Sequence, residues 1–430
     1  MIGRAVARPL RLDVLQAIPW LRQDTAVWAA VLAFTASRLA LVVVGLWSMA
    51  TFPLSKDGNG AWSEWNHLVP IDWVAMFSRW DGRWIMYVAR DGYSFQFGQT
   101  GESNASFAPL LPGFMWLGAH LIGWTDTQGL LAVGVVISHV AFLLALVYLA
   151  LLVSRTWDTP LAVRTVVCLA VFPLGFFYSA TYTEAIFLAP AVAAFVYAGE
   201  RRWWLAGVCG ALCVLTRTYG VLIAIPLLYE YLRSTRVAPV AAGSSGHAEA
   251  GLRTPAATSR EWSERLFAVG PQVLWLGLIP LAMLGWMAYM WLKVGDPLAM
   301  IHAQALWHRT LMPPWETFQN FFSGKIDWFT FKSNHSGLDL AFTLFYGALV
   351  ALSWRLKRKS LPLFATLLYM PMVCTNLLSS VPRFGLELFP AFIVLGQLTA
   401  QRRRLVAYCA VAGAGLVYLM ARWAVGYWVA

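Results

Sequence analysis

Long, uninterrupted runs of apolar residues constrain this chain more than any other feature. Hydrophobic residues make up 59% of its 430 residues and charged residues only 12%, whereas a soluble domain is nearer half apolar and a quarter charged. Several runs reach the roughly 20 residues that an α-helix needs to cross a bilayer. The apolar residues are consecutive and do not alternate with polar ones, which excludes a transmembrane β-barrel. The sequence therefore predicts an all-α polytopic membrane protein.

About eleven segments are predicted to span the membrane. They cover 26–48, 129–153, 161–178, 183–199, 203–216, 219–232, 271–292, 339–354, 361–378, 386–400 and 405–424. Residues 107–124 are also apolar, but a further crossing there would reverse every later loop against its charges. We therefore expect 107–124 to be re-entrant or interfacial. No internal repeat is visible, although many transporter folds contain one.

Short basic clusters predict the orientation. They lie between apolar runs, and such clusters stay on the cytoplasmic side. The predicted cytoplasmic segments are 154–160, 200–202, 233–268, 355–360 and 401–404, with a flexible linker inside 233–268. The predicted external segments are 50–106, 179–182, 293–338 and 379–385. We expect one transmembrane domain over 1–430 with a large first external loop, and no nucleic-acid partner despite the net charge of +11.

The five cysteines all lie inside apolar runs, which predicts no disulfide framework. Cys209 and Cys213 are four residues apart on one helical face, but no histidine or acidic residue lies nearby in the sequence. Packing is therefore the expected role of this pair, and no metal site is predicted.

The polar stretch Arg79-Trp80-Asp81-Gly82-Arg83-Trp84 follows the first span and places an unpaired carboxylate among tryptophans. Bulky apolar residues recur there at steps of four and three, which predicts one aromatic-faced helix lying in the membrane interface; they are Trp73, Phe77, Trp80, Trp84 and Tyr87. Asp81 falls near one margin of this stripe, away from the arginines of its own helix. It suits a base for a lipid-borne hydroxyl, and a solvated or capping aspartate is the structural alternative.

Other ionisable residues lie within or beside apolar spans, where they are costly and usually face a cavity or a partner. Arg38, Glu184 and Arg217 are of this kind, and Arg383 lies in a predicted external loop. A structural ion pair, for instance Glu184 with Arg217, is the alternative for each. Two external arginines beside a carboxylate would form an anionic headgroup site, because arginine holds phosphate through paired donors.

Several short motifs occur in order along the chain. They are Ser37-Arg38-Leu39, Arg79-Trp80-Asp81-Gly82, Gly92-Tyr93, Phe107-Ala108-Pro109-Leu110-Leu111-Pro112, Tyr182-Thr183-Glu184, Leu215-Thr216-Arg217 with Gly220, Gly295-Asp296-Pro297-Leu298 with Gln304 and Trp307, and Pro382-Arg383 with Phe389-Pro390. In this order the chain resembles the PIG-V family, the second mannosyltransferase of glycosylphosphatidylinositol synthesis, together with its bacterial relatives.

The resemblance implies a GT-C fold, a multispanning bundle with its catalytic carboxylate in the first external loop. It implies an inverting transfer of mannose from polyprenyl-phosphate mannose to a lipid-linked or glycan acceptor, with no cofactor. Asp81 would be the catalytic base, and the substrate-binding residues would be Arg79, Trp80, Tyr93, Glu184, Arg217, Gln304, Arg309 and Arg383. The site would face the non-cytoplasmic side of the plasma membrane in a bacterium, or of the endoplasmic reticulum in a eukaryote.

Two alternatives stay open at this point. One is another GT-C activity, with a different sugar or a protein acceptor; in a bacterium the acceptor would be a glycolipid or cell-wall glycan. The other is a transporter or flippase of lipid-linked sugars, which would also bury charges in a helical bundle.

Overall fold

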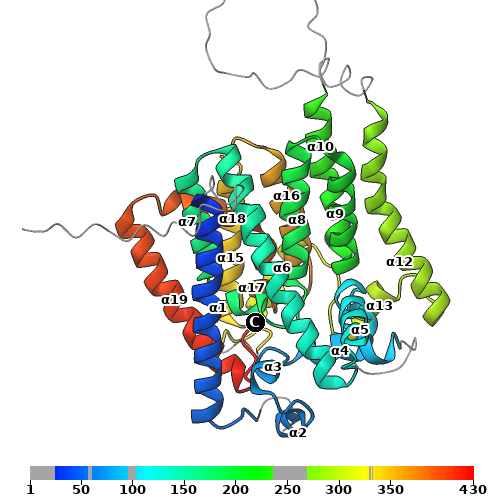
Figure 1. Ribbon diagram of the computed structural model, residues 1–430, viewed down its shortest axis with the longest axis vertical. Coiled ribbons are helices and arrows are strands. Elements are labelled where there is room, and N and C mark those ends of the chain that lie inside the picture. The colour runs from blue at the N-terminus through cyan, green and yellow to red at the C-terminus, as the bar shows by residue number, and fades with distance from the viewer. Residues whose placement is uncertain (1–24, 57–60, 95–102, 236–268, 329–330, 332) are drawn as a thin grey trace, which may run out of the picture.

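The computed structural model describes residues 25–56, 61–94, 103–235, 269–328, 331 and 333–430. Within these ranges the regular secondary structure is helical, apart from two isolated β-bridges. Most of the helices run side by side in one bundle, with the smaller α2 (Ala61–Leu68), α3 (Asp72–Met76) and α4 (Asp81–Asp91) gathered at its lower end (Figure 1).

Four helical segments of the described chain are long and apolar enough to cross a membrane. They are α1 (Thr25–Thr51), α6 (Thr127–Thr156), the segment Pro271–Val294 that joins η6 (Pro271–Gly277) to α12 (Leu278–Val294), and α19 (Arg402–Ala424). A bent pair, Val381–Glu387 with Phe389–Leu398, would make a fifth span. The prediction of a helical membrane protein is thus confirmed, and the number of about eleven spans stays a prediction.

Shorter apolar helices fill the rest of the bundle. They are α5 (Leu110–Ile122), α7 (Thr159–Ala170), α8 (Glu184–Gly199), α9 (Trp203–Thr216), α15 (Gly337–Ser353) and α16 (Ser360–Val373). α10 (Ala224–Ser234) follows a 3₁₀ turn, η5 (Thr218–Ile223). α8 is buried along almost its whole length between α6 and α9. Its many alanines allow this, because small residues let neighbouring helices approach closely.

Prolines end or bend three segments that were predicted as single helices. α7 stops at Ala170, shortly before Pro173, so the predicted helix 161–178 is too long. α16 stops at Val373 with Pro371 in its last turn, five residues before the predicted end. The predicted span 386–400 is broken between η7 (Gly385–Glu387) and α18 (Phe389–Leu398), with a bend of 84°. Pro390 lies in the first turn of α18, where its fixed φ and missing N–H favour a helix start.

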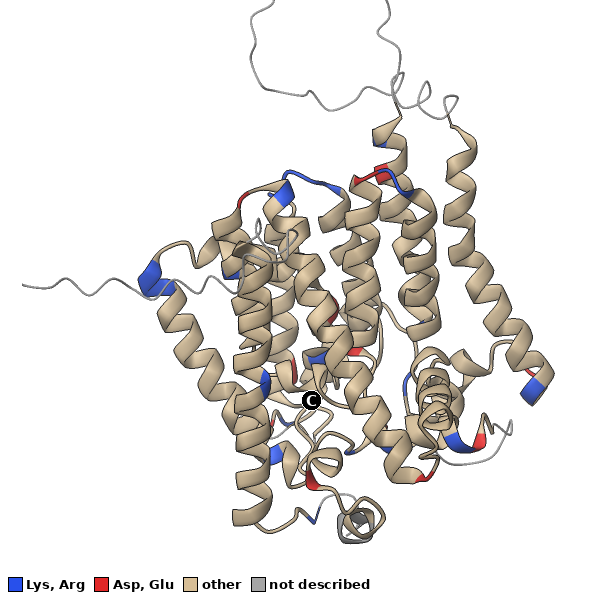
Figure 2. Ribbon diagram, viewed as in Figure 1, with Lys and Arg blue, Asp and Glu red and all other residues tan. Residues whose placement is uncertain are grey.

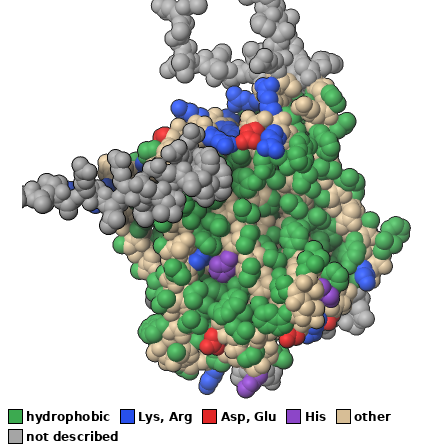
Figure 3. Space-filling view, in the orientation of Figure 1, with side chains coloured by type: hydrophobic (Ala, Val, Ile, Leu, Met, Phe, Trp, Pro, Cys, Tyr) green, Lys and Arg blue, Asp and Glu red, His purple; other side chains and the backbone are tan. Residues whose placement is uncertain are grey.

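The surface divides into an apolar body and charged ends. The basic clusters of the α8–α9, α15–α16 and α18–α19 connections lie toward the upper part of the bundle (Figure 2). Below them hydrophobic side chains cover much of the visible face (Figure 3). Many are strongly exposed, for example Leu121 at 76% and Leu292 at 84%. Such a continuous apolar surface fits a lipid environment, and the assignment of the upper end to the cytoplasm stays a prediction.

Residues 107–124, predicted to be re-entrant or interfacial, form the 13-residue helix α5 and flanking turns. α5 packs against α6 and α4 at the lower part of the bundle, and Figure 1 draws it at an angle to the long helices. Its path relative to a membrane stays a prediction.

The single aromatic-faced helix predicted over 73–87 is wrong. α3 ends at Met76 and α4 begins only at Asp81. Between them the chain turns through Trp80, whose φ of +54° is rare for a residue with a side chain. Gly82 is the second residue of α4. The aromatic residues kept a helical spacing across a break, so their spacing alone could not reveal the turn.

Candidate active site

Asp81 is the first residue of α4, where a carboxylate is favoured by the positive end of the helix dipole. Its backbone N–H donates to the hydroxyl of Tyr182 at 2.9 Å, and that hydroxyl donates to the carbonyl of Arg79 at 3.2 Å. The N-cap position of α4 is Trp80, whose side chain does not cap the helix, so Asp81 is not a capping aspartate. The turn at Trp80 and the hydroxyl of the buried Tyr182 together fix the start of α4, and so the position of the Asp81 carboxylate.

The sequence suggested an unpaired carboxylate at Asp81, but in the structure this carboxylate has a partner. Arg383 Nη1 lies 2.6 Å from Asp81 Oδ2, across 302 residues of sequence. The two side chains are 10% and 17% exposed, respectively, so Asp81 is not a solvated surface residue either. The helix wheel missed the partner because it comes from α17 (Val381–Phe384), at the opposite end of the chain.

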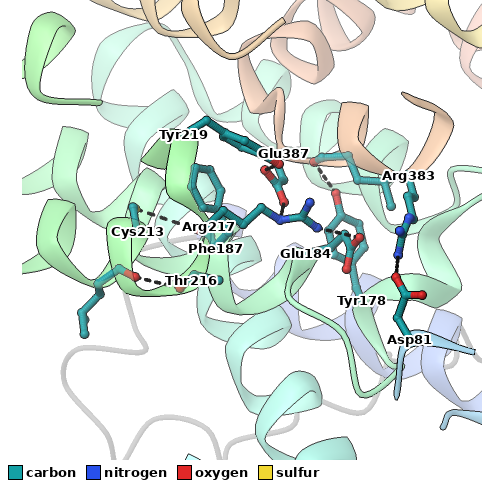
Figure 4. Close-up of polar contacts among 12 residues, drawn as sticks. Asp81, Tyr178, Glu184, Phe187, Cys213, Thr216, Arg217, Tyr219, Arg383 and Glu387 are labelled. Atoms are coloured by element: carbon teal, nitrogen blue, oxygen red, sulfur yellow. Dashed lines mark hydrogen bonds and ion pairs between the residues drawn. The ribbon is translucent and has the colours of Figure 1, made fainter. Parts of the chain in front are cut away.

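A second group of charges lies beside this pair (Figure 4). Arg217 directly follows the last residue of α9 and lies between two carboxylates. Its Nη2 is 2.7 Å from Glu184 Oε1, and its Nε is 2.6 Å from Glu387 Oε1. The hydroxyl of Tyr219 donates to the other oxygen of Glu387 at 2.9 Å. Both carboxylates are fully buried. The ion pair between Glu184 and Arg217, weighed as the structural alternative, is therefore present.

Glu387 was missed by the sequence analysis. It was placed inside the predicted span 386–400, where it is the only charged residue. An ionisable residue within an apolar span is itself a signal of a buried partner or a cavity. That signal was available from the sequence, but the break between η7 and α18 that turns Glu387 toward Arg217 was not.

The ring of Phe384 links the two groups of charges. The guanidinium carbons of Arg217, Arg383 and Arg309 lie 4.8, 4.9 and 5.4 Å from its centroid. Arginine is attracted to an aromatic face at such distances. The structure thus gathers three of the predicted site residues around one ring, Arg217, Arg309 and Arg383, and two more, Asp81 and Glu184, pair with these arginines. We call these residues, with Glu387 and Phe384, the arginine cluster.

Arg309 differs from the other two arginines of the cluster. Among the described residues it forms no ion pair, and its Nη2 donates to the carbonyl of Ser379. Burial lowers the pKa of its guanidinium below the usual range, and the positive charge of Arg383 lowers it further. Arg383 also has a donor left, since its buried Nε has no hydrogen-bond partner in the described structure. These two residues can therefore offer donors to an added anion.

The other predicted substrate-binding residues are held elsewhere. Arg79 is fully buried and donates to Asn66 Oδ1 at 2.7 Å and to the carbonyl of Ala424 at 3.0 Å. The ring of Trp80 packs edge to face on Trp428, which in turn lies 5.5 Å from the guanidinium carbon of Arg383. Trp80 is therefore one ring away from the cluster, and Arg79 supports the fold of this corner.

Tyr93 and Gln304 lie on the side of the helices α12 and α13 (Ala299–Leu306). The hydroxyl of Tyr93 donates to the carbonyl of Phe107 at 2.6 Å. The carbonyl of Gln304 accepts the backbone N–H of Arg309 at 2.9 Å, so Gln304 shapes the turn that presents Arg309. Contact of either side chain with a substrate stays a prediction.

Arg38 has a structural explanation. Its guanidinium is buried and donates to the carbonyls of Gly175 and Ala170 and to Ser179 Oγ. It also lies 4.6 Å from the ring centroid of Phe142. These contacts satisfy a cation inside an apolar span by joining α1 to the turn that follows α7. Within the described residues, no group of three or more His, Cys, Asp and Glu side chains could hold a metal ion.

No protein-family model and no curated protein sequence matches the chain. Among solved structures it is similar to crystal structures of the Archaeoglobus fulgidus oligosaccharyltransferase. One of these structures is tethered to an acceptor peptide that contains the NVT sequon. With it the TM-score is 0.45 and the identity 14%, over 95% of this chain and 56% of that chain. The apo form gives 0.44 and 14%, over 95% and 57%. The structure of the archaeal oligosaccharyltransferase AglB from Archaeoglobus fulgidus with an inhibitory peptide and a dolichol-phosphate gives a TM-score of 0.40 and an identity of 16%, over 91% of this chain and 56% of that chain.

This chain therefore spans little more than half the length of each of these structures. A likeness this weak says nothing about substrate or reaction. The PIG-V resemblance and the GT-C fold stay predictions, and the function has to be inferred from the chain's own residues.

Proposed function

We propose that this protein is a membrane-embedded, inverting glycosyltransferase with Asp81 as its catalytic base. It would transfer mannose from polyprenyl-phosphate mannose to a lipid-linked or glycan acceptor on the non-cytoplasmic side of the membrane. The observation that supports this most is the Asp81–Arg383 pair, because it places one carboxylate against a group of arginines with donors to spare. A base and an anion site are the two things that this reaction needs from a protein.

The reaction balances with these groups alone. Asp81 takes the proton of an acceptor hydroxyl as its oxygen attacks the anomeric carbon. The bond between that carbon and the phosphate oxygen breaks on the opposite face, and the phosphate leaves with the electron pair. A phosphate monoester with a second pKa near ~6 can leave as an anion. It therefore needs cations that stabilise the developing charge, not the second carboxylic acid that glycosidases use.

The roles of the arginines follow from their contacts. Arg309 and Arg383 would hold the donor phosphate, since both lie at Phe384. Arg309 uses one of its five N–H donors on the carbonyl of Ser379, and the buried Nε of Arg383 has no partner in the described structure. Arg217 is already held by Glu184 and Glu387, so we assign it to positioning Phe384 and its neighbours. In this structure Arg383 neutralises Asp81. A bound phosphate would draw Arg383 toward itself and leave the carboxylate free to accept a proton.

The test is transfer from radiolabelled polyprenyl-phosphate mannose by the purified protein in nanodiscs, with and without Asp81→Asn. Loss of a general base predicts a fall in turnover of about 10²–10⁴-fold. Asp91→Asn is the matched control, because Asp91 lies at the other end of α4 in an exposed pair with Arg90. Equal turnover in wild type and Asp81→Asn would refute the assignment of Asp81. Binding of the donor without turnover in any form would point to a different sugar or to a missing acceptor.

A further inference from the structure

A cavity of about 240 Å³ with a mixed polar and apolar lining lies between α14 (Pro314–Ser323), the turn before α15 and residues 376–378. It is lined by Asn320, Phe321, Ser323, Asn334, His335, Asn376, Leu377 and Leu378. Phe321 and Leu378 are buried and pack together with Leu340 of α15, which gives the cavity a fixed apolar base. The amide, hydroxyl and imidazole groups surround this base.

Two of the three asparagines keep hydrogen-bonding capacity for a ligand. Asn376 is already engaged at both amide atoms, because its oxygen accepts from the N–H of Thr310 and its nitrogen donates to the carbonyl of His308, both at 2.9 Å. Asn320 donates only to the sulfur of Met312 at 3.4 Å, and its oxygen accepts from no described residue. Asn334 forms no described side-chain hydrogen bond and is exposed. An amide offers both donors and acceptors, as hydroxyl groups of a sugar require.

The lining excludes charged ligands and large ones. It contains no lysine, arginine, aspartate or glutamate, so an anionic or cationic headgroup would find no ion-pair partner of these types in it. Pockets for drug-sized ligands measure about 300–1,000 Å³, and this cavity is smaller. An aromatic ring and apolar side chains at the base, with amides around them, suit one neutral sugar ring with its apolar and its hydroxyl-bearing faces.

The cavity is joined to the arginine cluster by one stretch of backbone. Leu378 lies in its wall, the carbonyl of the next residue, Ser379, accepts from Arg309, and Arg383 follows four residues later. Five residues of extended chain span at most ~18 Å. The Cα of Leu378 is therefore no farther than that from the Cα of Arg383. Asn376 fastens the other side of this stretch to the segment that carries Arg309.

We propose that this cavity is a subsite for a neutral sugar unit of the acceptor, distinct from the anion site at the arginines. The link to an acceptor rests on the proposed glycosyltransferase function; the binding of a neutral sugar does not. The subsite would hold one ring of the acceptor glycan while another hydroxyl of that glycan reaches Asp81.

The experiment is equilibrium dialysis of radiolabelled methyl α-D-mannopyranoside against the full-length protein in nanodiscs. Asn320→Ala and Asn334→Ala each remove one amide from an exposed position, so both variants are expected to fold. Each should weaken binding about fivefold, the effect of one lost hydrogen bond, and the double variant more. Gln319→Ala is the matched control, since Gln319 is an exposed amide next to Asn320 on α14 that does not line the cavity. It should bind as wild type does.

Two further samples separate this subsite from the reaction centre. Asp81→Asn should bind the glycoside like wild type, and inorganic phosphate should not displace it. The proposal is overturned if wild type shows no saturable binding, if the double asparagine variant binds as well as Gln319→Ala, or if phosphate competes. Asparagine-dependent binding in a protein that transfers no sugar would uphold the subsite and refute the proposed function instead.

Discussion

Two groups of charges meet at Phe384, and they differ in how the protein treats them. Arg217 is shared by two carboxylates, Glu184 and Glu387, that are both fully buried. Arg383 faces the single carboxylate of Asp81, which keeps 17% of its side chain exposed. The first group has two carboxyl groups for one arginine, and both carboxyl groups are closed to solvent. The second is balanced, partly open, and lies beside Arg309, which has no ion pair in the described structure.

The comparison separates a structural network from a site that can receive a ligand. A buried ion pair contributes little net stability, but losing one partner is costly because the other charge is left uncompensated. A pair whose carboxylate keeps part of its surface accessible, as Asp81 does, can exchange its partner for a substrate. The closed group should therefore respond to mutation mainly in stability, and the open group mainly in activity.

The largest effect is expected from Arg217→Met, which keeps the length of the side chain but leaves two buried carboxylates unpaired. The free energy of unfolding should fall by about 3–5 kcal/mol. Thermal unfolding of the purified protein in nanodiscs measures this. A variant as stable as wild type would show that the two groups do not differ as described.

Arg383→Met should act on the reaction rather than on the fold. It removes one guanidinium from the position where phosphate charge develops, and loss of one such donor typically lowers turnover by about 10²–10³-fold. The measurement is the initial rate of mannose transfer, compared with Arg422→Met as a control. Arg422 lies on α19 with its guanidinium carbon 4.0 Å from the ring centroid of Tyr427 and outside the cluster. A loss of stability as large as that of Arg217→Met would contradict the division between the groups.

The two groups also show how far the sequence could reach. The polar residues that form them stand out as charges in apolar company, which is why Glu184, Arg217 and Arg383 were recognised. Glu184 and Arg217 could be paired by inspection, because they end neighbouring apolar segments. Asp81 and Arg383 could not, because they are 302 residues apart and only the folded bundle brings α4 to α17.

Helix boundaries were predictable where the apolar run itself ends. The predicted segment 203–216 coincides with α9, and 183–199 differs from α8 by one residue. The boundaries failed where proline interrupts an apolar run, as at Pro173 and Pro390, since hydropathy does not register a missing N–H. For the same reason the sequence analysis missed Glu387, because hydropathy does not show the bend between η7 and α18 that turns Glu387 toward Arg217.

A smaller effect should follow from Tyr219→Phe, which removes the hydroxyl that donates to Glu387 at 2.9 Å. A hydrogen bond to a charged group contributes about 1.5–3 kcal/mol, so stability should fall by that much while mannose transfer is largely kept. Tyr148→Phe is the control, because the Tyr148 hydroxyl bonds only the neutral hydroxyl of Tyr197 within the described structure. A neutral bond contributes about 0.5–1.5 kcal/mol. Equal losses in both variants would mean that Glu387 is not charged in the folded protein.

The smallest effect is expected at the surface, from Arg155→Met. Arg155 pairs with Glu200 between the ends of α6 and α8, and the two side chains are 54% and 34% exposed. Exposed pairs typically contribute about 0.2–1 kcal/mol, and salt screens them. The difference between unfolding at low and at high ionic strength should therefore be slightly smaller for this variant than for wild type. Arg155 and Glu200 form the same kind of contact as Arg217 and Glu184, but in water. A loss of unfolding free energy as large as that of Arg217→Met would therefore show that burial does not explain the contrast between the two groups at Phe384.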